Sequence, residues 1–484
     1  MKPVSSTPPD GLIAVVKEDC PTCRLVEPVL QQLGSTKRGI VVYTQDDPTF
    51  PCDVPQVIDD RTLNTSFDLE IETVPTLIRH ESGQEAERVV GWNRADWQRV
   101  TAIADLGEEL PAHQPGCGSR SIEPGATYKL RARFGDTGIR ARRIQVDQFE
   151  DEIETCFDRG WSDGLPVVPP TPERILRMLE GTSRAPDEIV GQVPPDLAPC
   201  TIERVAINAV MAGCLPEYMP VVLAALEAAL EPNFTLHGIL CSTCFTAPLI
   251  IVNGPITEKI GMNSSLNALG QGNRANATIG RALNLIVRNV GGGRPGEIDR
   301  STFGAPSKYT FCFAEDESDP EWQPLSVARG ITSGANAVTL FQGEGVQGIL
   351  DQRSRTPSEL TRSLAAGLLA VCHPHICEWA HAVLVISPEH YSIFRAAGWD
   401  RDRITDALFE ATTRNGEDVV QGAGGIAEGV PENRAGEMVP KFPPDGLLLV
   451  RAGGQAGLYS AILAGWPGGR AYKESHPITR EIIE

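Results

Sequence analysis

The cysteine pair in Cys20-Pro21-Thr22-Cys23 is the feature that most constrains this chain. An apolar, β-prone run at residues 11–17 leads directly into the pair, and apolar side chains at helical spacing follow it from residue 25 to residue 33. The pair therefore falls at the start of a predicted helix, where unpaired backbone N–H groups and the positive end of the helix dipole favour a thiolate. We expect Cys20 to be an accessible attacking sulfur and Cys23 to resolve the mixed disulfide that forms on it.

Strands and a helix are expected after the cysteine pair in a specific order. Strand-like runs occupy residues 39–43, 73–78 and 87–92, and a helical segment begins near Arg94. This order, with Val74-Pro75-Thr76 downstream of the CxxC motif, resembles the thioredoxin-like family over residues 1–105. The resemblance implies a thioredoxin-like fold, a cis-proline at Pro75 that faces the dithiol, and a groove flanked by Val74 and Thr76 in which an extended substrate segment lies. Cis X-Pro bonds are a small minority, so this placement of Pro75 is a specific expectation.

Two positions near the cysteine pair depart from the thioredoxin pattern. Ala14 stands where thioredoxins carry a buried acid that assists proton transfer, and Glu18-Asp19 stands where a tryptophan usually precedes the motif. Loss of the acid and added negative charge near Cys20 should slow thiolate release. We therefore expect a dedicated electron donor to its own chain rather than a general thioredoxin. The alternative for a lone CxxC is half of a zinc site, with Cys52 as a third ligand.

A connecting region is expected at residues 106–147. Glycine and proline punctuate residues 106–125, which indicates a loop or linker. Cys117 lies there between two glycines, close to Arg120, which would stabilise a thiolate. It could receive the disulfide from Cys20, or it could be an incidental thiol of a flexible linker. Residues 127–134 and 138–146 alternate apolar and basic side chains, so we expect a two-stranded hairpin with one solvated basic face.

Residues 148–484 carry helical segments separated by glycine and proline loops, together with short apolar strands. Helices are expected from Glu173, at residues 203–212 and at residues 220–230, and buried strands at residues 249–252, 338–341, 383–386 and 447–450. Strands that alternate with helices predict a large mixed α/β domain, so the whole chain is expected to be α/β.

The large domain resembles a poorly characterised bacterial family found beside, or fused to, short selenoprotein-like modules with a U-G-S-C motif. The segments that carry the resemblance are residues 159–171, 205–218, 252–255, 274–281 and 453–457. The family implies no settled reaction. Cys117-Gly118-Ser119-Arg120 keeps a sulfur at the first position of the U-G-S-C motif and lacks the second cysteine.

Two cysteine-containing clusters of the large domain have the chemistry of a site. Cys241 and Cys244 precede an apolar strand and could form a second redox pair, half of a metal site, or part of the core. His373, His375 and Cys377 are candidate metal ligands, and a structural cluster of the same residues is the alternative.

A third cluster, at residues 262–281, is dense in asparagine, serine, glycine and arginine. Arg274, Asn276, Thr278 and Arg281 are candidates to bind an oxyanion or carboxylate at a helix N-terminus. Helix caps and turns could use the same residues. The cluster matches neither a P-loop nor a dinucleotide-binding fingerprint.

Charge and cysteine content limit the partners of the chain. A formal net charge of -20 argues against sequence-independent nucleic-acid binding, which needs clustered cations. The start of the chain lacks the pattern of a signal peptide, and its apolar stretches are shorter than the about 20 residues that span a bilayer. We therefore expect a cytoplasmic protein without membrane contact. In that compartment, the 12 cysteines are expected to be free, catalytic or metal-binding thiols rather than a disulfide framework.

These observations favour a thiol-dependent oxidoreductase. The dithiol of Cys20 and Cys23 would supply electrons to a cysteine-based site in the large domain that acts on a small anionic substrate, with a cellular thiol as reductant and no cofactor apart from the candidate metal ion. The first alternative is a lyase that uses paired cysteines, with or without a metal, to cleave a carbon–sulfur or carbon–metalloid bond. The second is a redox-regulated binding protein with no active site in the large domain. The sequence leaves the oligomeric state open, with a homo-oligomer as one expectation.

Overall fold

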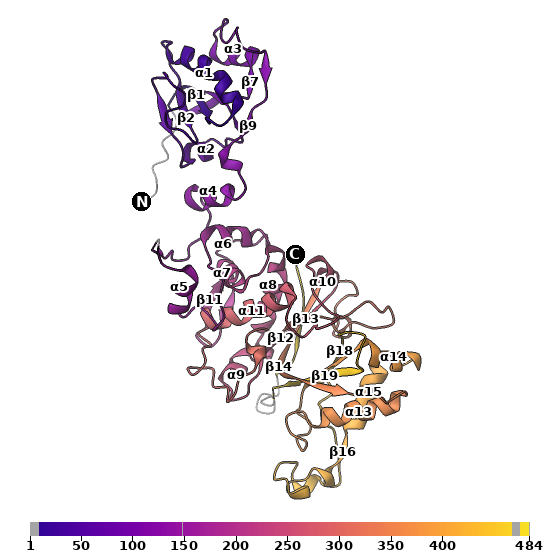
Figure 1. Cartoon of the computed structure of the whole chain (residues 1–484). Coiled ribbons are helices and arrows are strands. Elements are labelled where there is room, and N and C mark those ends of the chain that lie inside the picture. The colour runs from indigo at the N-terminus through magenta and orange to yellow at the C-terminus, as the bar shows by residue number, and fades with distance from the viewer. Residues whose placement is uncertain (1–8, 148, 467–474, 484) are drawn as a thin grey trace. The chain divides into compact units, whose positions relative to one another are not determined.

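The computed structural model describes residues 9–147, 149–466 and 475–483. The chain divides into two compact units, with the boundary between Thr137 and Gly138 (Figure 1). Both units combine helices with a β-sheet, so the α/β class predicted from the sequence is confirmed.

The first unit is built on a five-stranded sheet with the order β3-β2-β1-β5-β6. Strands β1, β2 and β3 are parallel, and β5 and β6 extend the sheet in antiparallel fashion. The elements of this unit in chain order are β1 (Gly11–Val16), α1 (Pro21–Gly34), β2 (Val41–Thr44), β3 (Val57–Asp59), α2 (Asn64–Asp68), β4 (Thr73–Val74), β5 (Thr76–Glu81), β6 (Gln84–Val90), β7 (Trp92–Asn93), α3 (Arg94–Thr101), β8 (His113–Gln114), β9 (Cys117–Gly118) and α4 (Ala126–Phe134).

The apolar face of α1 explains why this segment packs as a helix against the sheet. Val26, Val29, Leu30 and Leu33 recur at helical spacing and are all buried, and the burial of each such side chain contributes about 1.5–3 kcal/mol. Pro21 occupies the first turn, where a backbone N–H is not needed for helical hydrogen bonding. The helix therefore starts at a defined residue and places Cys20 at its N-cap.

The hairpin predicted for residues 127–134 and 138–146 is wrong. The first segment lies in helix α4, where Leu130 is buried and the ring of Phe134 lies 6.1 Å from that of Phe67 in α2. Its leucine, lysine, arginine and alanine residues all favour helix, which outweighs the alternating pattern once a helix can pack there. The second segment forms neither helix nor strand, and Glu203 accepts hydrogen bonds from the backbone N–H groups of Arg140 and Ala141.

The second unit contains a seven-stranded sheet with the order β13-β12-β14-β19-β15-β18, in which β20 also pairs with β14. Its helices are α5 (Glu152–Asp158), α6 (Pro172–Leu179), α7 (Ile202–Ala212), α8 (Met219–Ala229), α9 (Leu236–Cys241), α10 (Ile256–Lys259), α11 (Arg274–Asn289), α12 (Leu325–Ala328), α13 (Pro357–Leu369), α14 (Pro388–Ala396) and α15 (Arg401–Thr412). Its strands are β10 (Ile189–Val193), β11 (Ala198–Thr201), β12 (Ala247–Asn253), β13 (Cys312–Ala314), β14 (Ala337–Leu350), β15 (Ala382–Ile386), β16 (Arg414–Asn415), β17 (Met438–Val439), β18 (Leu447–Arg451), β19 (Tyr459–Gly465) and β20 (Ile478–Glu481).

Both faces of the seven-stranded sheet are covered. Along β12, Ile250 and Val252 join the apolar core that contains α7, α8 and α11, whereas Leu249 and Ile251 join a second core on the other face. Helices α13, α14 and α15 pack around β18 and β19 (Figure 1). The apolar segments predicted as strands correspond to β12, β14, β15 and β18, because strands buried on both faces have continuous apolar runs.

A buried ion pair connects α15 to the sheet of the second unit. The guanidinium of Arg401 lies 3.1 Å from the carboxylate of Glu315, which directly follows β13. Glu315 also accepts hydrogen bonds from the Asn253 amide (2.6 Å), the Trp322 indole (2.8 Å) and the Leu325 backbone N–H (2.7 Å). The pair is thus supported by further hydrogen bonds, which a buried carboxylate requires.

Within the described part of the chain, no helix combines the length and the apolar character needed to cross a bilayer.

Candidate redox site

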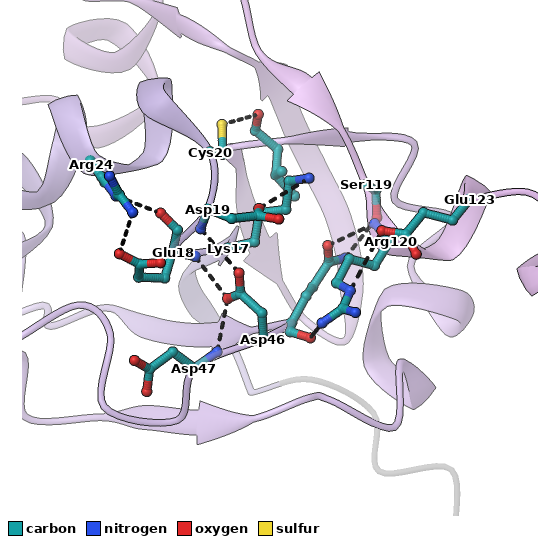
Figure 2. A network of polar contacts seen from close by, with 12 residues as sticks. Lys17, Glu18, Asp19, Cys20, Arg24, Asp46, Asp47, Ser119, Arg120 and Glu123 are labelled. Carbon is teal, nitrogen blue, oxygen red and sulfur yellow. Dashed lines mark hydrogen bonds and ion pairs between the residues drawn. The ribbon is translucent and has the colours of Figure 1, made fainter.

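The turn between β1 and α1 presents Cys20. Its backbone is fixed by Asp46, whose carboxylate accepts hydrogen bonds from the N–H groups of Glu18 (2.7 Å) and Asp19 (3.1 Å), as Figure 2 shows. Cys20 then adopts an extended conformation at the N-cap of α1. The sulfur consequently lies at the positive end of the helix dipole, where negative charge is stabilised.

Three thiols meet at this helix start. Cys20 Sγ lies 3.6 Å from the carbonyl oxygen of Val74, and the thiols of Cys23 and Cys117 both hydrogen-bond to the Cys20 sulfur. The hydrogen bond from Cys23 is the largest cause that lowers the pKa of Cys20 to about 5, with help from the Cys117 thiol and the backbone N–H groups of Cys23 and Thr22. Cys20 is therefore the thiolate of the three at neutral pH.

The two partner thiols stay protonated. Burial, followed by the neighbouring Cys20 thiolate, raises the pKa of Cys23 far above its ordinary value. Burial and the hydrogen bond to Cys20 also raise the pKa of Cys117. One sulfur is therefore ionised and two are hydrogen-bond donors, a division that suits a single attacking nucleophile.

We expect the ultraviolet absorbance of the Cys20 thiolate, taken as the difference between the native chain and a Cys20→Ser variant, to appear with a midpoint near pH 5. Because the pKa is depressed in the folded state, the thiolate contributes stability above the pKa of the unfolded chain, and this contribution is lost as the pH falls through about 5. A midpoint near the ordinary thiol value of about 8.5 would contradict the hydrogen-bonded cluster. Circular dichroism at each pH controls for acid unfolding.

Residues 113–118, which we call the Cys117 strap, cover the cysteine pair. Cys117 pairs with Val74 between β9 and β4, and His113 pairs with Asn93 between β8 and β7. The Thr22 hydroxyl, inside the CxxC motif, donates a 2.6 Å hydrogen bond to the carbonyl of Pro115. The strap therefore lies in the place that the thioredoxin resemblance assigns to an extended substrate segment.

The expectation that Cys20 would be accessible is wrong. Cys20 and Cys23 are both 0% exposed, whereas Cys117 is partly exposed. The reason is the Cys117 strap, which comes from a distant part of the sequence and packs against the loop at Val74. Cys117 is accordingly an ordered part of the first unit, which contradicts its interpretation as an incidental thiol of a flexible linker.

The loop at Pro75 has the expected cis peptide bond, but the Thr76 hydroxyl bonds within the loop rather than facing an open groove. The peptide bond between Val74 and Pro75 is cis, as the resemblance implied. Thr76 is buried, and its hydroxyl donates to the carbonyl of Thr73 at 2.6 Å. The Thr76 hydroxyl therefore stabilises the loop, and Val74 is the loop residue that pairs with the Cys117 strap.

The zinc alternative for the cysteine pair is wrong. Cys52 lies beside the later turns of α1, where its backbone N–H donates to Glu27 (2.8 Å) and its carbonyl accepts from Gln31 (3.0 Å). Among the residues that the structure describes, no three histidine, cysteine or acidic side chains are arranged to hold a metal ion.

The same finding excludes the metal site predicted from His373, His375 and Cys377. His375 Nδ1 hydrogen-bonds to the Glu428 carbonyl (3.0 Å), and the His373 ring accepts from the His375 backbone N–H (3.1 Å). Cys377 packs in a small apolar cluster with Val419, Val430 and Val439. His375 and Cys377 do line a polar cavity of about 450 Å³, together with Glu378, His381, Arg434 and His476 among others.

Cys241 and Cys244 lie in different local environments. Cys241 ends α9, and Cys244 packs against the main core of the second unit while its carbonyl accepts from the Ser301 hydroxyl (2.8 Å). Cys372 lies near Cys244, and burial raises the pKa of its thiol to about 12. Burial also raises the pKa of Cys241. A second redox pair formed by Cys241 and Cys244 stays a prediction.

The residues predicted to bind a small anion have structural partners. Arg281 forms a two-point ion pair with Asp163 (2.8 Å for each contact). The buried Asn276 amide bridges the backbone of Asn263, and the Thr278 hydroxyl donates to the Arg274 carbonyl within α11. Arg274 itself is exposed and donates to the carbonyl of Gly213 at 3.0 Å. These four residues therefore have structural roles in and around α11, and an anion site formed by them stays a prediction.

Sequence reasoning identified the three sulfurs of the site and missed the residues that seat the strap. The hydrogen bond from the Thr22 hydroxyl to the Pro115 carbonyl has no local sequence signal. The glycine at position 116 is a sequence feature that the close packing of the strap explains. A Cβ at this position would lie 2.4 Å from the Thr73 side chain and 2.8 Å from the Val74 carbonyl. Only glycine lets the strap approach Val74 this closely.

The chain matches no protein-family model, and a comparison with curated proteins found no match either.

Proposed function

We propose that the first unit is a dithiol–disulfide oxidoreductase in which Cys20 is the nucleophile and Cys23 the resolving thiol. The observation that carries this proposal is the position of the Cys20 sulfur, at the N-cap of α1 and 3.6 Å from the Val74 carbonyl oxygen of the cis-proline loop. Hydrogen bonding from the Cys23 thiol lowers the pKa of Cys20 to about 5 and supports the same role. A thiolate with a pKa below ambient pH attacks a disulfide and is also a good leaving group, so the pair can cycle in both directions. The thioredoxin resemblance, with its cis-proline loop beside the pair, supports the same reaction.

The electron acceptor that we propose is a mixed disulfide between a cysteine of the second unit and a small thiol: the dithiol reduces it to two thiols and itself becomes the disulfide of Cys20 and Cys23. Linked partners meet at an effective concentration of about millimolar, so tethering alone would favour this route over an external one. In the cavity near His375 the candidate acceptor is Cys377, which lines it. A reducing compartment such as the cytoplasm would return the dithiol to its thiol form through small cellular thiols.

The lyase alternative is less well supported. It requires ionised, paired cysteines in the second unit. Burial instead raises the pKa of the thiols of this unit for which a shift is resolved: Cys156, Cys200, Cys214, Cys241, Cys312, Cys372 and Cys377. These protonated thiols do not supply the ionised pair that such a lyase needs.

We expect a redox titration of the full chain in glutathione buffers to oxidise one pair first, that of Cys20 and Cys23. Quenching with an alkylating agent in denaturant, followed by peptide mass analysis, identifies which cysteines have become a disulfide at each potential. The buried Cys200 and Cys312 should remain thiols throughout, and they serve as internal controls. Co-purified zinc, or failure of Cys20 to enter any disulfide, would overturn the proposed function.

A further inference from the structure

The three cysteines of the cluster differ in their surface exposure. Cys20 and Cys23 have no exposed surface, whereas Cys117 is a partly exposed residue. We infer that Cys117 is an exchange thiol, through which an external disulfide passes its oxidising equivalents to the buried pair of Cys20 and Cys23. This inference rests on the proposed function and adds to it the residue that first attacks a disulfide from outside the first unit.

The Cys117 strap is anchored on both sides of the cysteine, which argues against a cover that simply swings away. Before Cys117, the strap pairs with β7 and accepts the hydrogen bond from Thr22. Immediately after it, the backbone N–H of Ser119 donates to the Glu72 carbonyl (2.9 Å), and the Ser119 hydroxyl accepts from the buried Gln45 amide (2.7 Å). The Arg120 backbone N–H donates to the same Gln45 side chain at 3.0 Å. Opening the strap would break the Thr22 hydrogen bond and the pairings with β7 and β4, while Ser119 and Arg120 stay fixed at Gln45.

The strap also places Cys117 where a substrate cysteine would have to be. Cys117 pairs with Val74, whose carbonyl oxygen lies 3.6 Å from the Cys20 sulfur, so the strap brings Cys117 beside the CxxC motif. An intramolecular thiol held beside its reaction partner reacts far faster than one that must diffuse to the site. The strap is thus built to exchange with Cys20 rather than only to cover it.

Electrostatics allow Cys117 to ionise at the right stage. The Cys20 thiolate is one of the causes that raise the pKa of Cys117, and the Lys17 ammonium lowers it. Lys17 is itself paired with Asp19 (3.2 Å). When Cys20 takes up a proton or enters a disulfide, its negative charge disappears, and ionisation of Cys117 then becomes easier.

The proposed exchange balances with a disulfide as the oxidant. Cys117 passes its proton to the Cys20 thiolate and attacks the external disulfide, so that one half remains bound to Cys117 and the other leaves as a thiolate, which takes the proton from Cys20. The Cys20 thiolate then attacks the Cys117 sulfur and releases the second half. Finally Cys23, after losing its proton to that released thiolate, attacks Cys20 and frees Cys117. In sum, one external disulfide becomes two thiols, and the dithiol becomes a disulfide.

We expect Cys117→Ser to slow oxidation of the dithiol by glutathione disulfide by about tenfold or more, because the buried Cys20 then has no surface thiol to react with. Serine keeps a hydrogen-bond donor beside Cys20, and the thiolate absorbance checks that Cys20 is still ionised. Cys52→Ser is the matched control, because it removes an exposed cysteine from the same unit and should leave the rate unchanged. An unchanged or faster rate in Cys117→Ser would overturn the inference and identify the strap as a lid that opens.

Trapping gives a second readout that does not depend on rates of turnover. In Cys23→Ser treated with glutathione disulfide, peptide mass analysis should find a disulfide between Cys20 and Cys117. In the double variant Cys23→Ser with Cys117→Ser, Cys20 should remain a thiol, and its ready coupling to glutathione would overturn the inference. The two proposals fail separately: if the native chain never forms the disulfide between Cys20 and Cys23 the proposed function is wrong, whereas if it forms equally fast without Cys117 only the inference is wrong.

Discussion

Replacing Cys20 with serine should abolish disulfide exchange by the full chain, with a loss of at least about a hundredfold in the rate of thiol–disulfide exchange, because a serine hydroxyl is almost entirely protonated at neutral pH. The loss should be larger than for any other cysteine, since Cys20 is the sulfur on which the two other thiols of the cluster converge. Reduction of a chromogenic aromatic disulfide, followed by the colour of the released thiolate, measures the rate.

Two variants sharpen this result. Cys23→Ser should still react once and then stop, because the attacking sulfur remains while its resolving partner is lost. Cys156→Ser should retain the native rate, because Cys156 is a buried thiol of the second unit whose pKa is raised by burial. Native-like turnover in Cys20→Ser would mean that another cysteine carries the reaction, and the dithiol proposal would be abandoned.

Breaking the buried ion pair of the second unit should have the largest effect on stability. Arg401→Met removes the cation beside Glu315 and is expected to destabilise this unit by about 3–5 kcal/mol, the usual cost of an uncompensated buried charge. Arg401 is also stacked over the Trp322 ring at 4.4 Å and donates to the carbonyls of Gln323 (2.8 Å) and Leu449 (2.6 Å). Urea denaturation, followed by tryptophan fluorescence and circular dichroism, measures the loss.

A matched control and a pH series test whether the lost charge causes the destabilisation of Arg401→Met. Arg403→Met makes the same substitution at an exposed position two residues along α15, where the guanidinium lies over Trp399, and should cost less than about 1 kcal/mol. Burial already raises the pKa of Glu315, and loss of Arg401 should raise it further. Because a raised folded-state pKa favours folding at low pH, the deficit in Arg401→Met should shrink as the pH falls toward the ordinary range of a glutamate. A deficit that does not change with pH would show that lost packing, not charge, is responsible.

Elements with strong local patterns were predictable from the sequence. β1 and α1 follow from an apolar run that ends at a CxxC motif with proline in the first turn, and the buried strands of the second unit follow from uninterrupted apolar runs. Residues 127–134 failed because their alternating pattern fits a strand while their residue types favour a helix, and only the contact with α2 decides between the two.

The candidate site divides in the same way. The three sulfurs stand out as residue types, but their contacts depend on partners that lie far away in the sequence. Pro115 is 93 residues from Thr22, and Arg281 is 118 residues from Asp163. Pairings at this separation leave no periodic or local signal in the sequence. The burial of Cys20 and the ion pair of Arg281 with Asp163 could therefore be learned only from the fold.

The place where the first unit ends has a practical consequence. A fragment cut at residue 105, where the thioredoxin resemblance stops, would lack residues 113–118 and would display a bare thiolate next to a vacant groove. Such a fragment would be open to alkylation, peroxide and unrelated peptides, and it would misrepresent the selectivity of the native chain. A fragment that ends after Thr137 keeps Cys117 and the residues that hold the strap in place. It is therefore the fragment in which we expect the thiol chemistry of the first unit to be retained.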